Sequence, residues 1–226
     1  MAALGEGTPS PAMSTAAAAV SRRQFVLRRL HSLTGIVPIG VYLVFHIMIA
    51  NASVLGGPAA FDRAVQAIGA LPGPTLLAIE VLFIYAPLLF HGLYGFVRVR
   101  DADVASPLRH DHLGAYLYSL QRLSGVIAFF FVGWHVWTTR AQYYFADREI
   151  SYAYMRTLMQ DPLWFWIFAV GTLASVFHFT NGIWTFCITW GVTVGPRAQR
   201  TLRAACLGGF VVMYGTAVAI FLAFRA

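Results

Sequence analysis

Residues 121–137, QRLSGVIAFFFVGWHVW, decide the fold. This stretch is apolar for more than two helical turns and then places one imidazole, that of His135, between two tryptophans. Histidine is costly in hydrocarbon, so an ionisable residue inside a membrane segment is a candidate functional residue. Four such histidines on four separate helices predict a partner that binds them in pairs. The other three are His46 in VYLVFHIMIA, His91 in PLLFHGLYG and His178 in ASVFHFTNG.

The composition is that of a membrane protein. The chain has 226 residues, of which 58% are hydrophobic and 11% charged, whereas soluble domains have roughly 25% charged residues. The net charge is +7, and all the basic residues are arginines that flank apolar segments, which indicates membrane orientation and not nucleic-acid binding. The two cysteines, Cys187 and Cys206, form no CxxC motif. Because an iron–sulfur cluster needs about four thiolates, this chain holds none on its own cysteines.

Five apolar segments follow a small-residue N-terminus. Residues 1–21 are rich in Ala, Gly, Ser and Pro and lack a basic start, so we expect a disordered tail and not a signal peptide. Residues 22–226 then form one transmembrane domain, an all-α bundle of five helices that are each long enough to cross a bilayer. Pro87 should kink the second helix. The expected helices are 33–55, 75–97, 114–138, 162–191 and 203–224.

The arginines predict the orientation of the chain. The side that contains the N-terminus carries eleven arginines and the opposite side carries five. Cytoplasmic loops carry the excess of positive residues, so the N-terminus is expected in the cytoplasm and the C-terminus outside. The outer loops contain FDRAVQAIGA and REISYAYMRTLM, which are candidates for short helices lying along the bilayer surface.

Depth in the bilayer sorts the four histidines into two pairs. With a rise of about 1.5 Å per residue, His46 lies about 20 Å from the inner boundary, and His135 lies just below the interfacial Trp137. His91 and His178 are each about 24 Å from the outer boundary, because their helices run inward. One pair is therefore in the outer half and one in the inner half. A single such histidine is often a core residue bonded to a neighbouring helix, but two at one depth can supply both axial ligands of one haem.

A short internal repeat groups the histidines in the same way. LTG at 33–35 precedes His46 and LSG at 123–125 precedes His135. The helices of His91 and His178 share the pattern Phe-His-x-x-x-Gly. The match is short, and small residues at this spacing are also common in ordinary helix packing. The repeat therefore supports the pairing without establishing it.

The sequences around the histidines resemble one known family. RRLHSLTGIVPIGVYLVFH, PLLFHGLYG, QRLSGVIAFFFVGWHVW and FHFTNGIWTFCITWGVTVGPRAQR are similar to segments of the Bacillus-type membrane anchor of succinate dehydrogenase. That family is the single-chain, five-helix diheme cytochrome b of succinate:quinone oxidoreductases. The similarity covers residues 22–203, and the last helix fits only in length and hydrophobicity. The N-terminal extension is the main departure.

The resemblance implies a bundle that encloses two b-type haems. His46 and His135 would ligate the outer haem iron, and His91 and His178 the inner haem iron. The implied partners are a flavoprotein with covalent FAD and an iron–sulfur subunit, both on the cytoplasmic face of a bacterial inner membrane. Electrons from succinate would pass through the inner and then the outer haem to a quinone, usually menaquinone in this family. The chain would be the quinone-reducing membrane subunit of respiratory complex II, with no succinate-oxidising site of its own.

Further polar residues are candidates for parts of this site. Glu80 lies in the outer part of the second expected helix and is a candidate to relay protons to a quinone. Equally, its carboxyl could reach the interface or bond to a neighbouring helix. Four other residues lie at the inner boundary and are candidates for binding haem propionates or the iron–sulfur subunit, although topology alone explains arginines there. They are Arg29, His31, Ser32 and Arg122.

Several alternatives remain open from the sequence. A quinol:fumarate reductase runs the same chemistry backward, and the sequence does not set the direction. The membrane subunits of formate dehydrogenases and hydrogenases usually differ in helix count and histidine placement. A haem-free transporter with a histidine proton relay would need more intramembrane carboxylates than Glu80. A purely structural anchor is the remaining alternative, and the oligomeric state of the complex is also open.

Overall fold

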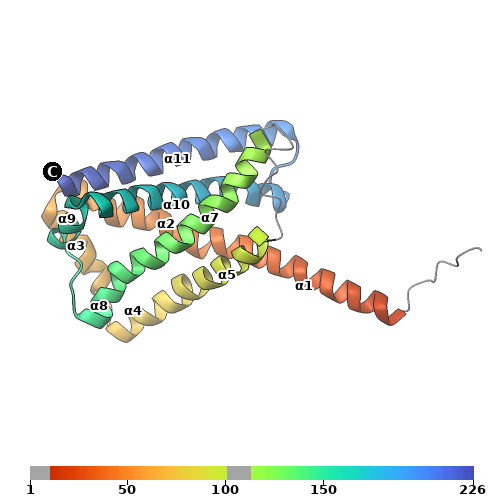
Figure 1. The fold of residues 1–226 in the computed structure, drawn as a ribbon, viewed down its shortest axis with the longest axis horizontal. Coiled ribbons are helices and arrows are strands. Elements are labelled where there is room, and N and C mark those ends of the chain that lie inside the picture. Colours follow the sequence, from red (N-terminus) through yellow and green to blue (C-terminus); the bar gives the residue numbers. More distant parts are fainter. Residues whose placement is uncertain (1–10, 101–112) are drawn as a thin grey trace, which may run out of the picture.

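The computed structural model describes residues 11–100 and 113–226, with side chains from Arg22 onward. Within these residues the chain is almost entirely helical and has no strand (Figure 1). Five spans are long and apolar enough to cross a membrane, which confirms the expected all-α, five-helix class. The spans are Arg22–Gly56, Gly73–Arg100, Leu113–Ala146, Pro162–Thr189 and Pro196–Arg225.

The first span is broken at Pro38 and again at His46. Pro38 has no N–H group to donate, so the helix restarts there. At His46 the backbone widens into a π-helical turn, and the Asn51 side-chain amide donates to the His46 carbonyl oxygen at 2.8 Å. The span consists of α1 (Pro11–Ile36), α2 (Pro38–Phe45), the π-helical turn η1 (His46–Ala50) and the 3₁₀-helix η2 (Asn51–Gly56).

The start of α1 lies inside the segment expected to be a disordered tail. α1 begins at Pro11 and projects beyond the rest of the bundle (Figure 1). Proline is favoured in the first turn of a helix, and the alanines at 16–19 have the highest helix propensity of any residue, which accounts for a helix here. The first ten residues lie outside the described part of the chain, and the domain boundary at residue 21 stays a prediction.

The second span also contains a π-helical turn. It comprises α4 (Gly73–Glu80), η3 (Val81–Tyr85) and α5 (Ala86–Arg100). Pro87 cannot donate a backbone hydrogen bond to the preceding turn, and η3 occupies that turn. The irregularity expected from Pro87 is therefore a widened turn that separates Glu80 from the His91 helix.

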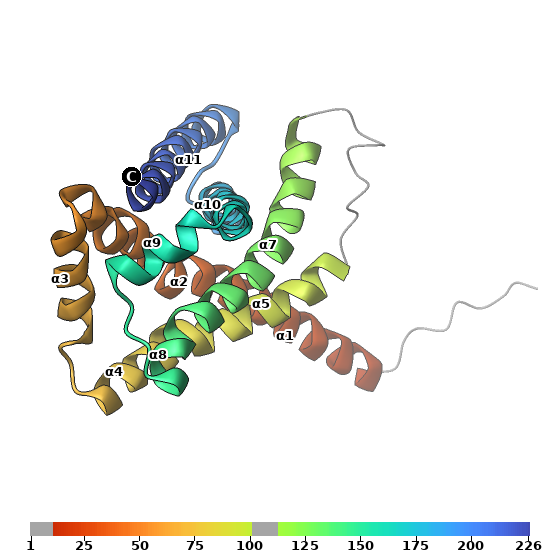
Figure 2. The same ribbon diagram turned by 60° about the vertical axis from the view of Figure 1, so that its left-hand side comes forward.

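The remaining three spans form the centre and one side of the bundle. α7 (Leu113–Thr138) is followed by the short helix α8 (Arg140–Ala146). α10 (Pro162–Thr189) begins at Asp161, whose carboxylate accepts hydrogen bonds from the Leu163 and Trp164 N–H groups. α10 packs between α7 and α11 (Pro196–Arg225), as Figure 2 shows. α10 thereby becomes the central helix of the bundle.

Two short helices close one end of the bundle. α3 (Pro58–Gly69) and α9 (Tyr152–Gln160) form where the two outer-loop sequences predict helices, which confirms both helices. The Asp62 carboxylate accepts a hydrogen bond from the Tyr152 N–H group at 2.7 Å, and this bond joins the two helices. Beneath them, Met159 is fully buried and Phe224, near the end of α11, is 1% exposed. We call this the capped end.

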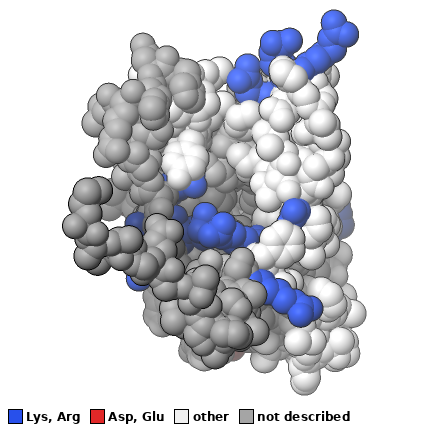
Figure 3. Space-filling model, turned by 90° about the vertical axis from the view of Figure 1, so that its right-hand side faces the viewer, with Lys and Arg blue, Asp and Glu red and all other residues white. Residues whose placement is uncertain are grey.

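The opposite end carries most of the arginines. It includes the start of α11, the last turn of α5 and the projecting part of α1 (Figure 1). Figure 3 looks onto this face and shows arginine side chains spread across it. We call it the arginine-rich end. Its arginines in the described chain are Arg22, Arg23, Arg28, Arg29, Arg98, Arg100, Arg122, Arg197, Arg200 and Arg203.

Packing beneath the capped end predicts the effect of a core substitution. Phe224→Ala removes a ring that meets Phe61 edge-on with centres 5.0 Å apart. The change should lower the free energy of unfolding by about 3–5 kcal/mol. Leu222→Ala is the matched control, because Leu222 lies on the same helix but is 55% exposed. Thermal unfolding in detergent micelles should show a much larger loss for Phe224→Ala, and equal losses would contradict this account of the core.

Candidate functional site

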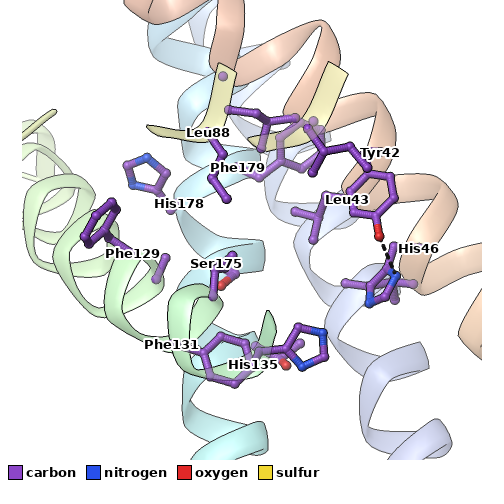
Figure 4. Close-up of a pocket in the computed structure, with 18 of the residues that line it drawn as sticks. Tyr42, Leu43, His46, Leu88, Phe129, Phe131, His135, Ser175, His178 and Phe179 are labelled. Carbon is purple, nitrogen blue, oxygen red and sulfur yellow. Dashed lines mark hydrogen bonds between the residues drawn. The ribbon is translucent and has the colours of Figure 1, made fainter. Parts of the chain in front are cut away.

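One elongated cavity of about 560 Å³ runs through the bundle and is lined by all four intramembrane histidines. Figure 4 shows His46 and His135 together in one part of it and His178 in another. Glu80 and Arg140 also line the cavity, as do His31 and Arg122. The cavity thus joins the two histidine pairs and contains charged side chains in addition to apolar ones.

The inner pair consists of His91 on α5 and His178 on α10. Their ring centres are 6.0 Å apart and their planes are nearly perpendicular, at 83°. His91 Nδ1 lies 2.8 Å from the His31 carbonyl oxygen, and His178 Nδ1 lies 2.9 Å from the Gln121 carbonyl oxygen. A carbonyl oxygen can only accept, so each Nδ1 carries the proton and each Nε2 keeps its lone pair. This arrangement is typical of histidines that bind a metal through Nε2.

The outer pair consists of His46, at the start of η1, and His135 on α7. Their ring centres are 5.8 Å apart at an angle of 70°. The Tyr42 hydroxyl lies 3.5 Å from His46 Nδ1, at the limit of a hydrogen bond (Figure 4). His135 Nδ1 is buried and has no hydrogen-bond partner in the described part of the chain. Since a buried polar nitrogen without a partner is costly, this pair has unused capacity to bind a ligand.

The spacing within each pair fits a shared metal. An imidazole nitrogen lies about 2 Å from a metal that it ligates, so two imidazoles on opposite sides of one metal have their centres about 6 Å apart. The structure brings together the same two pairs that the depth estimate indicates, at 5.8 and 6.0 Å. Among the described residues, no group of three or more His, Cys, Asp or Glu side chains could hold a metal ion. Each pair offers two imidazoles at the separation that one metal ion bound between them would require.

Two glycines make room for the inner imidazoles. A Cβ atom on Gly35 would overlap the His91 ring, and one on Gly125 would lie 2.7 Å from His178 Cε1. These are the glycines of the LTG and LSG repeats. The repeat therefore has a structural role: a helix that carries an outer histidine also provides the small residue against which an inner histidine packs.

The repeat also positions the carbonyl groups that bind the inner imidazoles. His31 and Gln121 each lie four residues before one of the two glycines. A helical carbonyl keeps a second lone pair beside its i+4 bond, and a bare glycine at i+4 leaves that lone pair accessible. The residue before each glycine also donates its hydroxyl to that carbonyl oxygen. Thr34 donates to the His31 oxygen at 3.0 Å, and Ser124 donates to the Gln121 oxygen at 3.2 Å. Each inner imidazole is thus held in the same way, by a backbone carbonyl group that lies four residues before a glycine.

His178 has additional support from two amide side chains. Gln121 Nε2 donates to the His178 carbonyl oxygen at 3.0 Å, and Asn181 Nδ2 donates to Gln121 Oε1 at 2.6 Å. Asn181 is buried, so its amide depends on this network. Neither amide is among the candidates from the sequence. The signal was present, because both are polar residues within one turn of His178 or of Gly125.

The four inner-boundary candidates divide into three that reach the cavity and one that does not. The His31 ring stacks on His91 with centres 4.2 Å apart. Ser32 accepts a hydrogen bond from the Trp190 indole at 2.8 Å, and Arg122 lies over the Tyr118 ring with its Nε buried and without a partner in the described chain. These three line the cavity. Arg29 instead stacks on Trp190 and Phe25, at 4.7 and 5.1 Å, which places its guanidinium beside other aromatic groups.

Glu80 is paired near the capped end of the cavity. Its carboxylate lies 2.8 Å from Arg140 Nη2 and accepts the Tyr144 O–H at 2.9 Å. Glu80 is 8% exposed, so the ion pair is largely removed from solvent. Of the two interpretations from the sequence, the bond to a neighbouring helix is present, and Glu80 also lines the cavity. Arg140 was missed, although a lone intramembrane carboxylate predicts a cationic partner.

Comparison with known proteins identifies the family. The family model described as succinate dehydrogenase/fumarate reductase transmembrane subunit matches residues 100–218. The succinate dehydrogenase cytochrome b558 subunit of Bacillus subtilis (strain 168) is 36% identical over 193 residues, which is 84% of this chain and 92% of that protein. The chain belongs to the succinate dehydrogenase/fumarate reductase transmembrane subunit family. This confirms the resemblance identified from the sequence.

Membership of the succinate dehydrogenase/fumarate reductase transmembrane subunit family has a direct consequence for function. The chain is the membrane subunit of an oxidoreductase complex, and its spans are those of a membrane protein. The family-model match includes α7 and α10, and so both His135 and His178. The haem-free transporter and the membrane subunits of formate dehydrogenases and hydrogenases are thereby set aside.

The close approach at Gly125 predicts opposite effects for two glycine substitutions on α7. Gly125→Ala should lower stability, because the new methyl group displaces the His178 ring. At Gly133 nothing lies within 4 Å of an added Cβ, so Gly133→Ala should raise stability by about 0.5–1 kcal/mol through helix propensity. Thermal unfolding in one detergent measures both changes. A gain in stability for Gly125→Ala would show that His178 does not depend on this glycine.

Proposed function

We propose that this chain is the diheme cytochrome b anchor of a succinate:quinone oxidoreductase and carries electrons from an iron–sulfur subunit to a quinone. The observation that carries the proposal is that two pairs of imidazoles line one cavity. The ring centres are 5.8 Å apart in the His46–His135 pair and 6.0 Å apart in the His91–His178 pair. The cytochrome b558 name of the Bacillus subtilis relative supports the same assignment. Succinate itself would be oxidised in a partner subunit.

The residues present fit two haem groups. His46 and His135 would hold the outer haem, and His91 and His178 the inner one. Haem bound at these positions would accept and release one electron at a time. The chain contributes protonated Nδ1 atoms fixed by carbonyl groups at the inner pair, which leave Nε2 free to bind iron. His31, Ser32 and Arg122 line the same part of the cavity, where they would be available to propionates.

The arginine-rich end is the proposed docking face for the catalytic subunits. A flavoprotein with covalent FAD and an iron–sulfur subunit would bind there, on the cytoplasmic side of a bacterial inner membrane. The projecting part of α1 offers arginines together with an apolar side chain, Phe25, that is 58% exposed. Binding at this end would place the iron–sulfur subunit nearer to the His91–His178 pair than to the other pair.

The capped end is the proposed site of quinone reduction, with menaquinone as the quinone. Glu80 is the candidate proton relay there, because it is buried, lines the cavity and accepts a hydrogen bond from a tyrosine hydroxyl. Reduction of a quinone consumes two protons as well as two electrons. A buried carboxylate linked to Tyr144 offers a route for such protons.

Haem content and spectra of single histidine variants test the proposal. Purified wild type should contain two low-spin b haems per chain in reduced-minus-oxidised spectra. His46→Ala and His135→Ala should each lose the same haem, and His91→Ala and His178→Ala the other. Each pair serves as the control for the other pair. A protein without haem, or one whose haem is indifferent to one of the two pairs, would exclude this function.

The role of Glu80 can be separated from haem reduction. Glu80→Gln in the intact complex should slow quinone reduction by about 100-fold, a typical contribution of positioned proton transfer, because the amide cannot donate a proton. Reduction of the haems by succinate should stay close to wild type. Glu149→Gln is the matched control, since Glu149 is exposed between the neighbouring helices α8 and α9. Equal quinone turnover in both variants would rule out Glu80 as the proton relay.

A further inference from the structure

Arg140 has hydrogen-bonding capacity that its known contacts do not use. Its Nη2 atom lies 2.8 Å from Glu80 Oε1 and donates to the Tyr144 hydroxyl at 3.1 Å. Its Nε atom is buried and has no partner in the described part of the chain. A guanidinium group has five N–H donors, and a buried donor without an acceptor is costly. Arg140 also lines the cavity, so a ligand in the cavity could supply the missing acceptor.

The guanidinium of Arg140 is held in place before any ligand binds. It lies over the rings of Tyr143 and Tyr144, with its Cζ atom 4.7 and 4.8 Å from the two ring centres. α7 ends at Thr138, and Thr139 has non-helical backbone angles, so Arg140 begins a new helix. The Thr139 hydroxyl donates to the His135 carbonyl oxygen at 2.6 Å. Thr139, at the break that precedes Arg140, is therefore bonded directly to the backbone of the outer-pair residue His135.

The cavity as a whole has more cationic than anionic side chains. Glu80 is the only acidic residue among the described residues that line the cavity, whereas three arginines line it: Arg98, Arg122 and Arg140. Arg122 and Arg140 share one unusual property, a buried Nε without a partner in the described chain. Arg122 lies beside Gln121 and the inner pair, and Arg140 lies five residues beyond His135 of the outer pair. Each histidine pair thus has one incompletely bonded arginine.

We propose that Arg140 binds a second anionic oxygen beside Glu80, at the outer histidine pair. Two sources share this chemistry: the carboxylate of a propionate on the outer haem, and the oxygen of a quinone as it is reduced. Guanidinium binds both with charge-assisted hydrogen bonds, and its planar array of donors can serve Glu80 and a second oxygen at once. The proposal rests on the proposed function and adds a ligand-binding role to a residue that otherwise only neutralises Glu80.

A set of variants separates this role from simple pairing with Glu80. Arg140→Gln leaves Glu80 as a buried unpaired charge and risks misfolding. The double variant Glu80→Gln/Arg140→Gln removes both charges, so it avoids that risk. Glu80→Gln in turn leaves Arg140 unpaired, so if Arg140 only neutralises Glu80, the double variant should be no more impaired than Glu80→Gln. If Arg140 binds a further oxygen, the double variant should be more impaired than Glu80→Gln. Arg148→Gln is the control, because Arg148 is exposed in the same region of the chain.

Two measurements on the purified complex distinguish the sources. A lower midpoint potential or weaker retention of the outer haem in the double variant, relative to Glu80→Gln, assigns the oxygen to a propionate. An unchanged haem with a KM for a water-soluble quinone raised about tenfold, as expected for one charged hydrogen bond, assigns it to the quinone. If the double variant and Glu80→Gln agree in potential, haem retention and KM, the proposal is wrong. A wild-type complex without haem would instead overturn the proposed function.

Discussion

The structure depends on one constraint: a polar imidazole nitrogen inside an apolar bundle is costly unless it finds a hydrogen-bond partner. For His91 and His178 the Nδ1–H groups bond to backbone carbonyl oxygens of α1 and α7, at 2.8 and 2.9 Å. A helical carbonyl can accept this second bond only where no side chain covers it. Gly35 and Gly125 meet that requirement, since an added Cβ on either would collide with the imidazole. The inner histidines therefore determine where two pairs of helices must touch.

The arrangement of the helices follows from those two contacts. His91 joins α5 to α1, and His178 joins α10 to α7, and both helix pairs are in contact along the bundle. The two imidazoles then face each other across the interior with ring centres 6.0 Å apart. A group that bound both would connect one helix pair to the other. The same residues would thus serve stability and cofactor binding, because the bonds that hold each helix pair together also fix the orientation of two imidazoles that line the cavity.

The sequence predicted the long-range pattern of this fold better than its short-range contacts. The five spans and the depth pairing of the histidines depend only on hydropathy and on the helical rise, and the structure places the His46 and His135 ring centres 5.8 Å apart. The contact between Glu80 and Arg140 depends on how α4 and α8 are rotated about their axes, which hydropathy does not determine. The haem-ligand roles themselves stay a prediction.

The two ends of the cavity differ in how firmly their histidines are held, and this difference suits the two ends to different tasks. The inner imidazoles are fixed by backbone carbonyl groups within regular helices. At the outer pair, His46 opens a π-helical turn, a second π-helical turn follows Glu80, and His135 Nδ1 has no partner in the described chain. Widened turns give up regular helical hydrogen bonding and often occur at functional sites. In the proposed function, electrons would arrive from a docked subunit over a fixed distance, whereas a quinone would have to enter and leave. The fully bonded inner pair and the less fully bonded outer pair would match these opposite requirements.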